Sequence, residues 1–286
     1  MNIFKDKTIL ITGSTGSFGT AFSKYLLNKE PKKIICFSRD WQKQMDLRNK
    51  LENPDCMRWF IGDIRDKDRL IRAFKNVDIV IHAAAIKDLE SCEYNPSETM
   101  LTNVVGTQNV IDACIENKVE KCLFISTDKA VNPINTYGTS KALAEKLWLG
   151  ANNYAADDNI MFSVCRYGNV VGSNGSVIPV FKKLIEQGAK ELPITHEDCT
   201  RFWFEMPKVM EFVKWCLENM KGNDLFVPKL PSIRITDLCK ALDMPYKIVG
   251  LRQGEKISEE MEQGYDSETN SWFLTVNEIK ETMKNI

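Results

Sequence analysis

Two pairs of proton-handling side chains lie close together in the stretch STDKAVNPINTYGTSK, residues 126–141. Tyr137 and Lys141 are four residues apart, a spacing that places two side chains on one face of a helix. A neighbouring ammonium lowers the pKa of a phenol from its usual value of about 10, so this pair suits the proton removal that accompanies hydride transfer. Asp128 and Lys129 stand shortly before the tyrosine and add a second acid and base, which a simple alcohol dehydrogenase does not need. From spacing alone, this second pair could equally be an exposed ion pair in a loop.

The elements around a Tyr-x-x-x-Lys motif decide whether it can act. Tyr25 and Lys29 have the same spacing, but they fall late in the first expected helix, far from the carboxyl edge of the sheet, so we interpret them as structural. Tyr137 and Lys141 follow an expected strand at 122–127 and open an expected helix. Ligands of open α/β sheets bind beyond the carboxyl ends of the strands, so the second position is the one suited to catalysis.

A glycine-rich turn follows the first expected strand. Gly13, Gly16 and Gly19 are spaced as Gly-x-x-Gly-x-x-Gly and open an amphipathic helix. Bare backbone lets a pyrophosphate approach the helix N-terminus, where N–H groups and the helix dipole favour anions. The sequence therefore predicts dinucleotide binding at this turn, by the three glycines together with Thr15, Ser17 and Phe18.

The end of the second expected strand bears on the choice of cofactor. An acidic residue here bonds the ribose 2′-hydroxyl of NAD, whereas an arginine accommodates the 2′-phosphate of NADP. The chain has Ser38 and Arg39 first and then Asp40, which favours NADP over NAD. Asp40 could instead be only the N-cap of the following helix.

Further cofactor contacts are predicted at the ends of the third and fourth strands. Asp63 and the adjoining Ile64 are expected near the adenine, although Asp63 could equally be a cap before a helix that starts near residue 66. Ala83 and Ala84 are small enough to let the cofactor lie against the fourth strand, and Lys87 follows them.

Short apolar runs alternate with amphipathic segments through the first half of the chain. The runs are nearly continuous, as in strands covered on both faces, at 8–12, 33–38, 57–63, 78–84, 122–127 and 160–172. Segments with helical periodicity lie between them, at 18–29, 68–75, 104–118 and 139–155. The sequence therefore predicts an α/β fold with a doubly wound, Rossmann-like parallel sheet.

The strict alternation ends after Gly172, which predicts a smaller and irregular substrate-binding region. We expect a Rossmann domain that binds NADP at residues 1–168, and a substrate-binding region at 169–286 that covers the carboxyl edge as a lid. Some segments of the second region are expected to return to the Rossmann sheet.

Composition excludes several classes of protein. The net charge is −1 with no basic stripe, so nucleic acid is not an expected partner. No apolar run reaches the ~20 residues of a membrane span, and the start does not resemble a signal peptide. Nine cysteines without a Cys-x-x-Cys pair predict reduced thiols in a cytoplasmic protein. The chain has two histidines, and neither has the neighbours for a metal site or a Ser-His-Asp triad.

Several motifs in order along the chain resemble one enzyme family. The glycine turn, HAAA at 82–85, Asn103, STDKA and YGTSK resemble extended short-chain dehydrogenases/reductases that act on nucleotide sugars. STDKAVNPINTYGTSK, RYGNVVGSNGSVIP, TRFWF, FVPKLPS and RQGEK narrow the resemblance to soluble UDP-N-acetylglucosamine 4,6-dehydratases of the C5-inverting type. Membrane-anchored, C5-retaining relatives tend to carry Met at the position of Tyr137.

The resemblance implies a lyase reaction with internal hydride transfer and NADP as cofactor. Tyr137, assisted by Lys141, would take the proton of the sugar's 4-hydroxyl while hydride leaves C4. Lys129, if its pKa is lowered, would remove the C5 proton, and Asp128 would protonate the departing 6-hydroxyl. Thr127 would hydrogen-bond the 4-oxygen.

The resemblance also implies contacts to a UDP-sugar, and assembly as a homo-oligomer. The implied substrate-binding residues are Lys87, Asn169, Val170, Ser176, Val177, Arg201, Arg252 and Glu255. The chain departs from the family pattern at Asp88, Gln253 and Ser258, which puts its fine substrate preference in doubt.

Three alternatives remain at this stage. They are a UDP-sugar 4-epimerase, which would need only Tyr137 and Lys141, a C5-retaining 4,6-dehydratase, and a non-catalytic scaffold that senses NADP.

Overall fold

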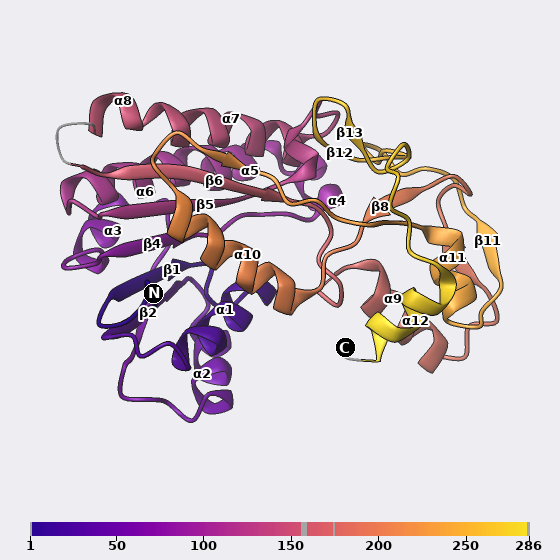
Figure 1. The fold of residues 1–286 in the computed structure, drawn as a ribbon, viewed down its shortest axis with the longest axis horizontal. Helices are drawn as coiled ribbons and strands as arrows, with labels where there is room; N and C mark the ends of the chain where they lie inside the picture. Colours follow the sequence, from indigo (N-terminus) through magenta and orange to yellow (C-terminus); the bar gives the residue numbers. More distant parts are fainter. Residues whose placement is uncertain (1, 156–158, 174, 285–286) are drawn as a thin grey trace.

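The computed structural model describes residues 2–155, 159–173 and 175–284. Figure 1 shows a large parallel sheet formed by the N-terminal half and a smaller group of elements from the C-terminal half beside it. The predicted fold class, a Rossmann-like doubly wound sheet, is confirmed.

The main sheet has seven strands in the order β3-β2-β1-β4-β5-β6-β9, and all neighbouring pairs are parallel. The strand order reverses between β1 and β4, where the carboxyl edge offers a crevice for ligands. The strands are β1 (Thr8–Thr12), β2 (Lys33–Ser38), β3 (Met57–Ile61), β4 (Ile79–His82), β5 (Lys121–Thr127), β6 (Met161–Tyr167) and β9 (Leu225–Phe226).

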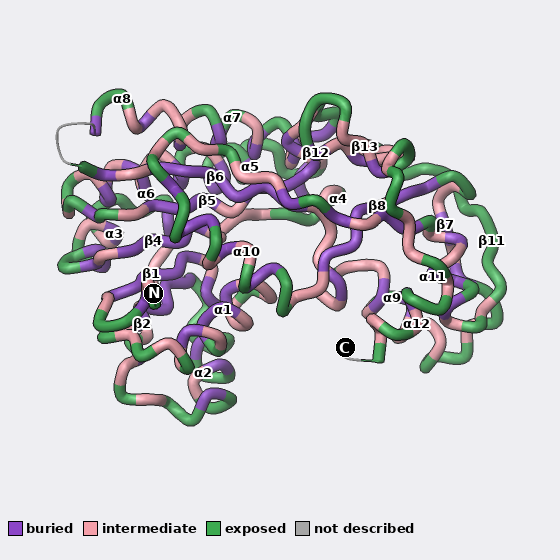
Figure 2. Tube along the Cα trace, viewed as in Figure 1, coloured by how far each residue is buried: buried purple, intermediate pink, exposed green. Residues whose placement is uncertain are grey.

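Helices cover both faces of this sheet, because successive side chains of a strand point to opposite faces. In β1, Ile9 and Ile11 pack in a core with α1 (Ser17–Leu27) and α10 (Met206–Asn219). Leu10 packs in a second core with α3 (Lys67–Ala73), α6 (Gly106–Glu116) and α7 (Thr136–Gly150). All five residues of β1 are buried, and Figure 2 shows the centre of the sheet buried throughout.

The helices before β6 follow the predicted alternation. They are α1 (Ser17–Leu27), α2 (Trp41–Lys50), α3 (Lys67–Ala73), α4 (Leu89–Tyr94), α5 (Pro96–Met100), the π-helix η1 (Leu101–Val105), α6 (Gly106–Glu116), the 3-10 turn η2 (Asp128–Ala130), α7 (Thr136–Gly150) and α8 (Asn152–Ala155). Among the described residues, no helix is long and apolar enough to span a bilayer.

Among the described residues, the C-terminal half builds three two-stranded sheets. Leu192, Ile194 and Ile233 of two of these sheets lie in a third core, whereas Met261 of the other sheet lies in the core shared by α1 and α10. Its elements are α9 (Val177–Glu186), β7 (Leu192–Ile194), β8 (Thr200–Phe202), α10 (Met206–Asn219), β10 (Ser232–Arg234), α11 (Ile235–Ala241), β11 (Tyr246–Ile248), β12 (Glu260–Glu262), β13 (Tyr265–Asp266) and α12 (Val276–Met283). Two segments lie against the main sheet: β9 pairs with β6, and α10 shares a core with α1.

Two of the boundaries that differ from the expectation have identifiable causes. The strand expected at 160–172 ends at Tyr167, because Gly168 lies against Asp128 and Phe202 and the chain turns out of the sheet there. Helix α7 begins at Thr136 rather than near residue 139, because the side chain of Asn135 accepts the N–H of Gly138 at 2.7 Å and caps the helix.

Candidate active site

One cleft of about 2470 Å³ lies at the carboxyl edge of the main sheet and is bordered by residues of the C-terminal half. All but one of the predicted site residues line it, from the glycine turn to the motifs around Asn169 and Arg252. The exception is Asp63, which is not among the lining residues. The fold thus brings together residues spread over more than two hundred positions of sequence.

The glycine turn has the shape that a pyrophosphate needs. Gly13 has φ +69°, and a Cβ there would lie 2.8 Å from the backbone of Ala84. A Cβ on Gly19 would lie 2.5 Å from the carbonyl oxygen of Gly13, so this glycine lets α1 pack closely on the turn. Gly16 is the N-cap of α1 without a side-chain cap, and the first turn holds no acidic residue. These features fit a dinucleotide cofactor at the helix N-terminus.

The residues at the end of β2 show whether Asp40 caps a helix or is free to bond a ribose hydroxyl. Its carboxylate accepts the N–H of Lys43 at 3.0 Å, so it is the N-cap of α2. Ser38 accepts a hydrogen bond from the amide of Gln44, and Arg39 is half exposed on the cleft. Arg39 thus offers the cleft a cation at this position, as does Lys43.

Asp63 is held by arginine instead of facing the cleft. It accepts two hydrogen bonds from the Arg65 guanidinium, at 2.8 and 3.0 Å, and lies 3.7 Å from Arg39. Burial opposes its charge, but the hydrogen bonds from Arg65 outweigh burial and lower its pKa. The helix that follows is capped by Asp66, so Asp63 is not its N-cap.

Lys141 is buried and Tyr137 is half-buried, and the pKa values of both side chains differ from the sequence-based expectation. Lys141 is fully enclosed; its Nζ donates to the carbonyl of Ile125 at 2.8 Å and lies 3.7 Å from the centre of the Phe124 ring. Burial lowers the pKa of Lys141 to about 7, against the pull of Glu145. Burial likewise raises the pKa of Tyr137 to about 12. The expectation that Lys141 lowers the tyrosine pKa was wrong: the cation that lowers it is Lys129.

The second pair is not an exposed loop ion pair. Asp128 is completely buried, and its Oδ1 accepts Lys129 Nζ at 3.1 Å and the Thr127 hydroxyl at 2.8 Å. Lys129 Nζ also lies 3.0 Å from Oε1 of Glu259, a carboxylate only 3% exposed. Burial opposes the lysine charge, but Asp128 and Glu259 outweigh burial and raise its pKa. The lowered Lys129 pKa that the family resemblance required is therefore wrong for the ligand-free site.

Glu259 was missed by the sequence analysis, as was a buried ion pair that supports it. Arg166 on β6 bonds Glu145 on α7 through two contacts, at 2.5 and 3.0 Å. The same guanidinium donates to the carbonyl of Met261 on β12 at 2.7 Å. This contact ties the strand that follows Glu259 to the helix that carries Tyr137 and Lys141.

Several buried polar atoms around the cleft have no hydrogen-bond partner among the described residues. A buried polar group without a partner costs free energy, so such atoms mark where a ligand would supply one. Those on the cleft include Ser126 Oγ, Asp128 Oδ2, Asn169 Oδ1, Ser176 Oγ and Glu259 Oε2.

The predicted substrate residues fall into two groups. Lys87, Asn169, Val170, Ser176 and Val177 line the cleft around the proton-transfer residues, and burial lowers the pKa of Lys87.

The other group is Arg201 on β8 together with Arg252 and Glu255 in the loop before β12. Arg201 donates to the carbonyls of Thr200, Ile257 and Lys256, so most of its guanidinium holds this loop. Glu255 accepts from Arg201 and from the backbone of Arg252, whose side chain is exposed at the cleft.

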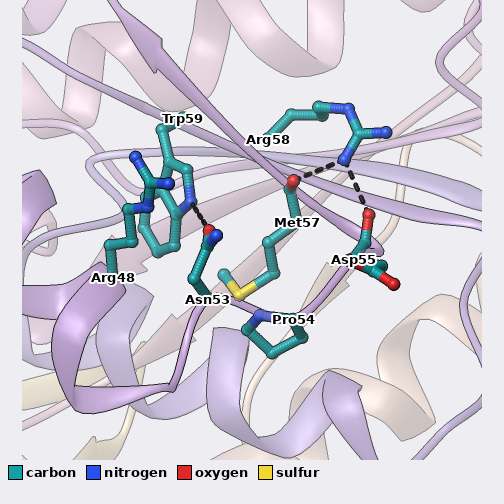
Figure 3. A pocket seen from close by; sticks show the side chains of 7 residues that line it. All are labelled: Arg48, Asn53, Pro54, Asp55, Met57, Arg58 and Trp59. Carbon is teal, nitrogen blue, oxygen red and sulfur yellow. Dashed lines mark hydrogen bonds between the residues drawn. The ribbon is translucent and has the colours of Figure 1, made fainter.

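A second, smaller pocket of about 490 Å³ lies at the amino end of β3, away from the carboxyl edge. Figure 3 shows Arg58 bonded to two carbonyls and Trp59 bonded to Asn53 there. None of the predicted site residues lines it.

The cysteines and potential metal ligands were located in the described part of the chain. All nine cysteines are free, and eight of them are buried. The described residues contain no cluster of histidine, cysteine and acidic side chains that could hold a metal.

Comparison with known proteins places the chain in a family. The profile of the polysaccharide biosynthesis protein family matches residues 9–281. The chain belongs to this family. The resemblance to extended short-chain dehydrogenases/reductases is thereby confirmed.

Members of known name are similar over almost the whole chain. The UDP-N-acetylglucosamine 4,6-dehydratase (inverting) of Campylobacter jejuni is 51% identical over 99% of this chain and 85% of its own. The UDP-glucose 4-epimerase of Rickettsia akari is 43% identical over 92% of this chain and 80% of its own. The crystal structure of Pen from Bacillus thuringiensis has a TM-score of 0.94 at 32% identity, covering 99% of this chain and 98% of its own.

Proposed function

We propose that the protein is a UDP-N-acetylglucosamine 4,6-dehydratase that inverts C5. The observation that carries this proposal is the buried Asp128–Lys129 pair, which shares one cleft with Tyr137 and Lys141. Elimination of water needs an acid and a base besides the redox residues, and this pair supplies both. The inverting dehydratase that is 51% identical to this chain supports the assignment.

The redox half would belong to Tyr137 and Lys141. NADP, when bound, would supply the chemistry of accepting the C4 hydride and returning it to C6. Tyr137 takes the proton of the 4-hydroxyl, and the Thr127 hydroxyl can bond the same oxygen. Because burial raises the tyrosine pKa to about 12, the phenolate needs nearby positive charge, and Lys129 is the cation already placed to favour it.

The elimination half would belong to Asp128 and Lys129. In the resting site Lys129 is an ammonium, which cannot accept a proton. Transfer of one of its protons across 3.1 Å to Asp128 produces both the neutral amine and the carboxylic acid that the reaction needs. The amine takes the C5 proton, the C5 electron pair is delocalised onto the 4-ketone, and the C6–O bond breaks as Asp128 protonates the hydroxyl, which leaves as water.

The proposal extends to the cofactor, the division of the chain and the assembly. Arg39 would bind the 2′-phosphate of NADP, since Asp40 is engaged as a helix cap. Residues 1–168 would bind the cofactor, and residues 169–286 would bind the substrate. A homo-oligomer would use the helices beside the catalytic segment, where Met100, Leu101 and Leu143 are exposed apolar side chains on α5, η1 and α7.

Incubation with UDP-N-acetylglucosamine and NADP tests the function. The account expects a product lighter by one water molecule, detected by mass spectrometry, and proton NMR couplings that show inversion at C5. Absence of the dehydrated product would overturn the assignment. Retention at C5 would leave the dehydratase but replace its stereochemical class.

A UDP-sugar 4-epimerase is the second candidate, because a protein of that name is 43% identical to this chain. Epimerisation requires Tyr137 and Lys141 and gives Asp128 and Lys129 no proton to transfer. Wild-type protein and Lys129→Ala are assayed with UDP-glucose and UDP-N-acetylglucosamine. An epimerised product formed equally by both proteins would favour the epimerase.

A further inference from the structure

Glu259 reaches the elimination centre from the far end of the chain. It precedes β12, yet its Oε1 lies 3.0 Å from Lys129 Nζ, and Asp128 contacts the same nitrogen at 3.1 Å. The ammonium is therefore held between two buried carboxylates. The Glu259 side chain is 3% exposed, and its second oxygen, Oε2, has no hydrogen-bond partner among the described residues and lines the cleft.

The position of Glu259 is fixed by its backbone. Its N–H donates to Ser267 Oγ at 2.9 Å, its carbonyl accepts the N–H of Ser267 at 2.8 Å, and the same hydroxyl contacts Thr200 Oγ1 at 2.9 Å. Two residues on, the carbonyl of Met261 accepts Arg166. Burying a carboxylate costs free energy unless a nearby positive charge or hydrogen bonds compensate the negative charge.

We propose that Glu259 is a positioning residue for the C5 base: it fixes Lys129 Nζ and stabilises the ammonium that Lys129 becomes on taking the C5 proton. This inference rests on the proposed function. In catalytic triads, a carboxylate likewise orients the base and stabilises the positive charge that the base acquires with the proton. Glu259 stays a carboxylate throughout, while the proton passes from C5 to Lys129.

Charges from five parts of the fold face Lys129. The carboxylates are Asp128 on η2 and Glu259 before β12; the other groups are Arg201 on β8, Lys87 between β4 and α4, and the phenol of Tyr137 on α7. Arg201 opposes the lysine charge, whereas the two carboxylates that touch Nζ favour it. Loss of the Glu259 charge therefore lowers the Lys129 pKa, and the free amine then exists at lower pH.

The first arm of the test needs no substrate. Lys129 is labelled with acetic anhydride across a pH series in wild type, Glu259→Gln and Glu262→Gln, and the labelled peptide is quantified by mass spectrometry. Glu262 is the matched control, because it lies on β12 but is half exposed and pairs with Lys229. We expect the midpoint of labelling to fall by at least about one pH unit in Glu259→Gln and to stay fixed in the control. An unchanged midpoint in Glu259→Gln would overturn the inference.

The second arm measures dehydration. We expect kcat of Glu259→Gln to fall about 100-fold with KM within about twofold, and the acid limb of its pH profile to move to lower pH. A merely structural role would lower activity without moving that limb, and this result would refute the proposal. Glu259→Asp keeps the charge, so its kcat should lie between those of Glu259→Gln and wild type, and the acid limb of its pH profile should match wild type. If Glu259→Gln does not fold, Glu259→Asp still tests the proposal. A kcat equal to wild type, with an unshifted limb, would refute it.

Failure of the proposed function gives a different result. If the wild-type protein does not dehydrate UDP-N-acetylglucosamine, that function falls, whereas the labelling arm still decides whether Glu259 controls the charge of Lys129.

Discussion

Replacement of Gly168 by alanine would displace Asp128 and so tests the proposed elimination residues. A Cβ at this position would lie 2.8 Å from Asp128 Oδ2, and 3.1 Å from both Met261 Cε and Phe202 Cβ. An ordinary contact begins at 3.4 Å, so the methyl group of Gly168→Ala overlaps the carboxylate by 0.6 Å (3.4 minus 2.8). The Asp128 carboxylate must move furthest, because its 2.8 Å contact is the shortest of the three.

Movement of Asp128 weakens two contacts at once. Its Oδ1 is held by the Thr127 hydroxyl at 2.8 Å and by Lys129 Nζ at 3.1 Å. Overpacking of a buried site costs about 1–3 kcal/mol of unfolding free energy, and a misplaced catalytic group costs up to about 100-fold in rate. We therefore expect Gly168→Ala to lose about 1–3 kcal/mol in urea unfolding and about 10- to 100-fold in dehydration.

Gly150→Ala is the matched control, because a Cβ there meets nothing within 4 Å. It should keep full activity and unfold at the same or a higher urea concentration, since alanine favours the helical conformation. The reasoning is refuted if Gly168→Ala dehydrates substrate within about twofold of wild type.

Three further predictions follow from the same geometry. Arg39→Ala should raise KM for NADP and leave KM for NAD unchanged in steady-state kinetics; equal changes would contradict the 2′-phosphate role. Glu145→Gln leaves the buried Arg166 without its partner and should cost about 3–5 kcal/mol in chemical unfolding, whereas Glu262→Gln should cost almost nothing. Lys141 has a folded pKa of about 7, below the 10.5 of an unperturbed lysine, so the unfolded chain binds more protons between these values. Wild type without ligand should therefore gain stability as pH rises through this range, and Lys141→Met should lose that gain; identical pH dependences would contradict it.

Local patterns predicted the sheet well, because each buried strand is a continuous run of apolar residues. β1 and β2 have the bounds that the sequence predicted. The ends that were missed depend on contacts between distant parts of the chain. β6 stops at Tyr167 because Gly168 meets Asp128 and Phe202, and hydrophobic periodicity carries no information on such contacts.

The candidate site was predicted as far as its motifs extend. Glu259 follows the RQGEK motif by three residues and meets Lys129 across 130 positions, so no spacing rule indicates that contact. The directions of the pKa shifts at Tyr137 and Lys129 were wrong for the same reason. Burial and charges from distant segments set those shifts, and the sequence shows only the neighbours along the chain.

The central claim is that the redox pair and the elimination pair are separate proton-transfer centres in one cleft. Lys129→Ala, loaded with NADP and mixed with UDP-N-acetylglucosamine, tests it directly. NADPH absorbance should rise more slowly than in wild type, because Tyr137 has lost the cation that favours its phenolate. It should then persist while mass spectrometry finds no loss of water, because C4 is oxidised and C5 keeps its proton. Loss of water by Lys129→Ala at the wild-type rate would contradict the account.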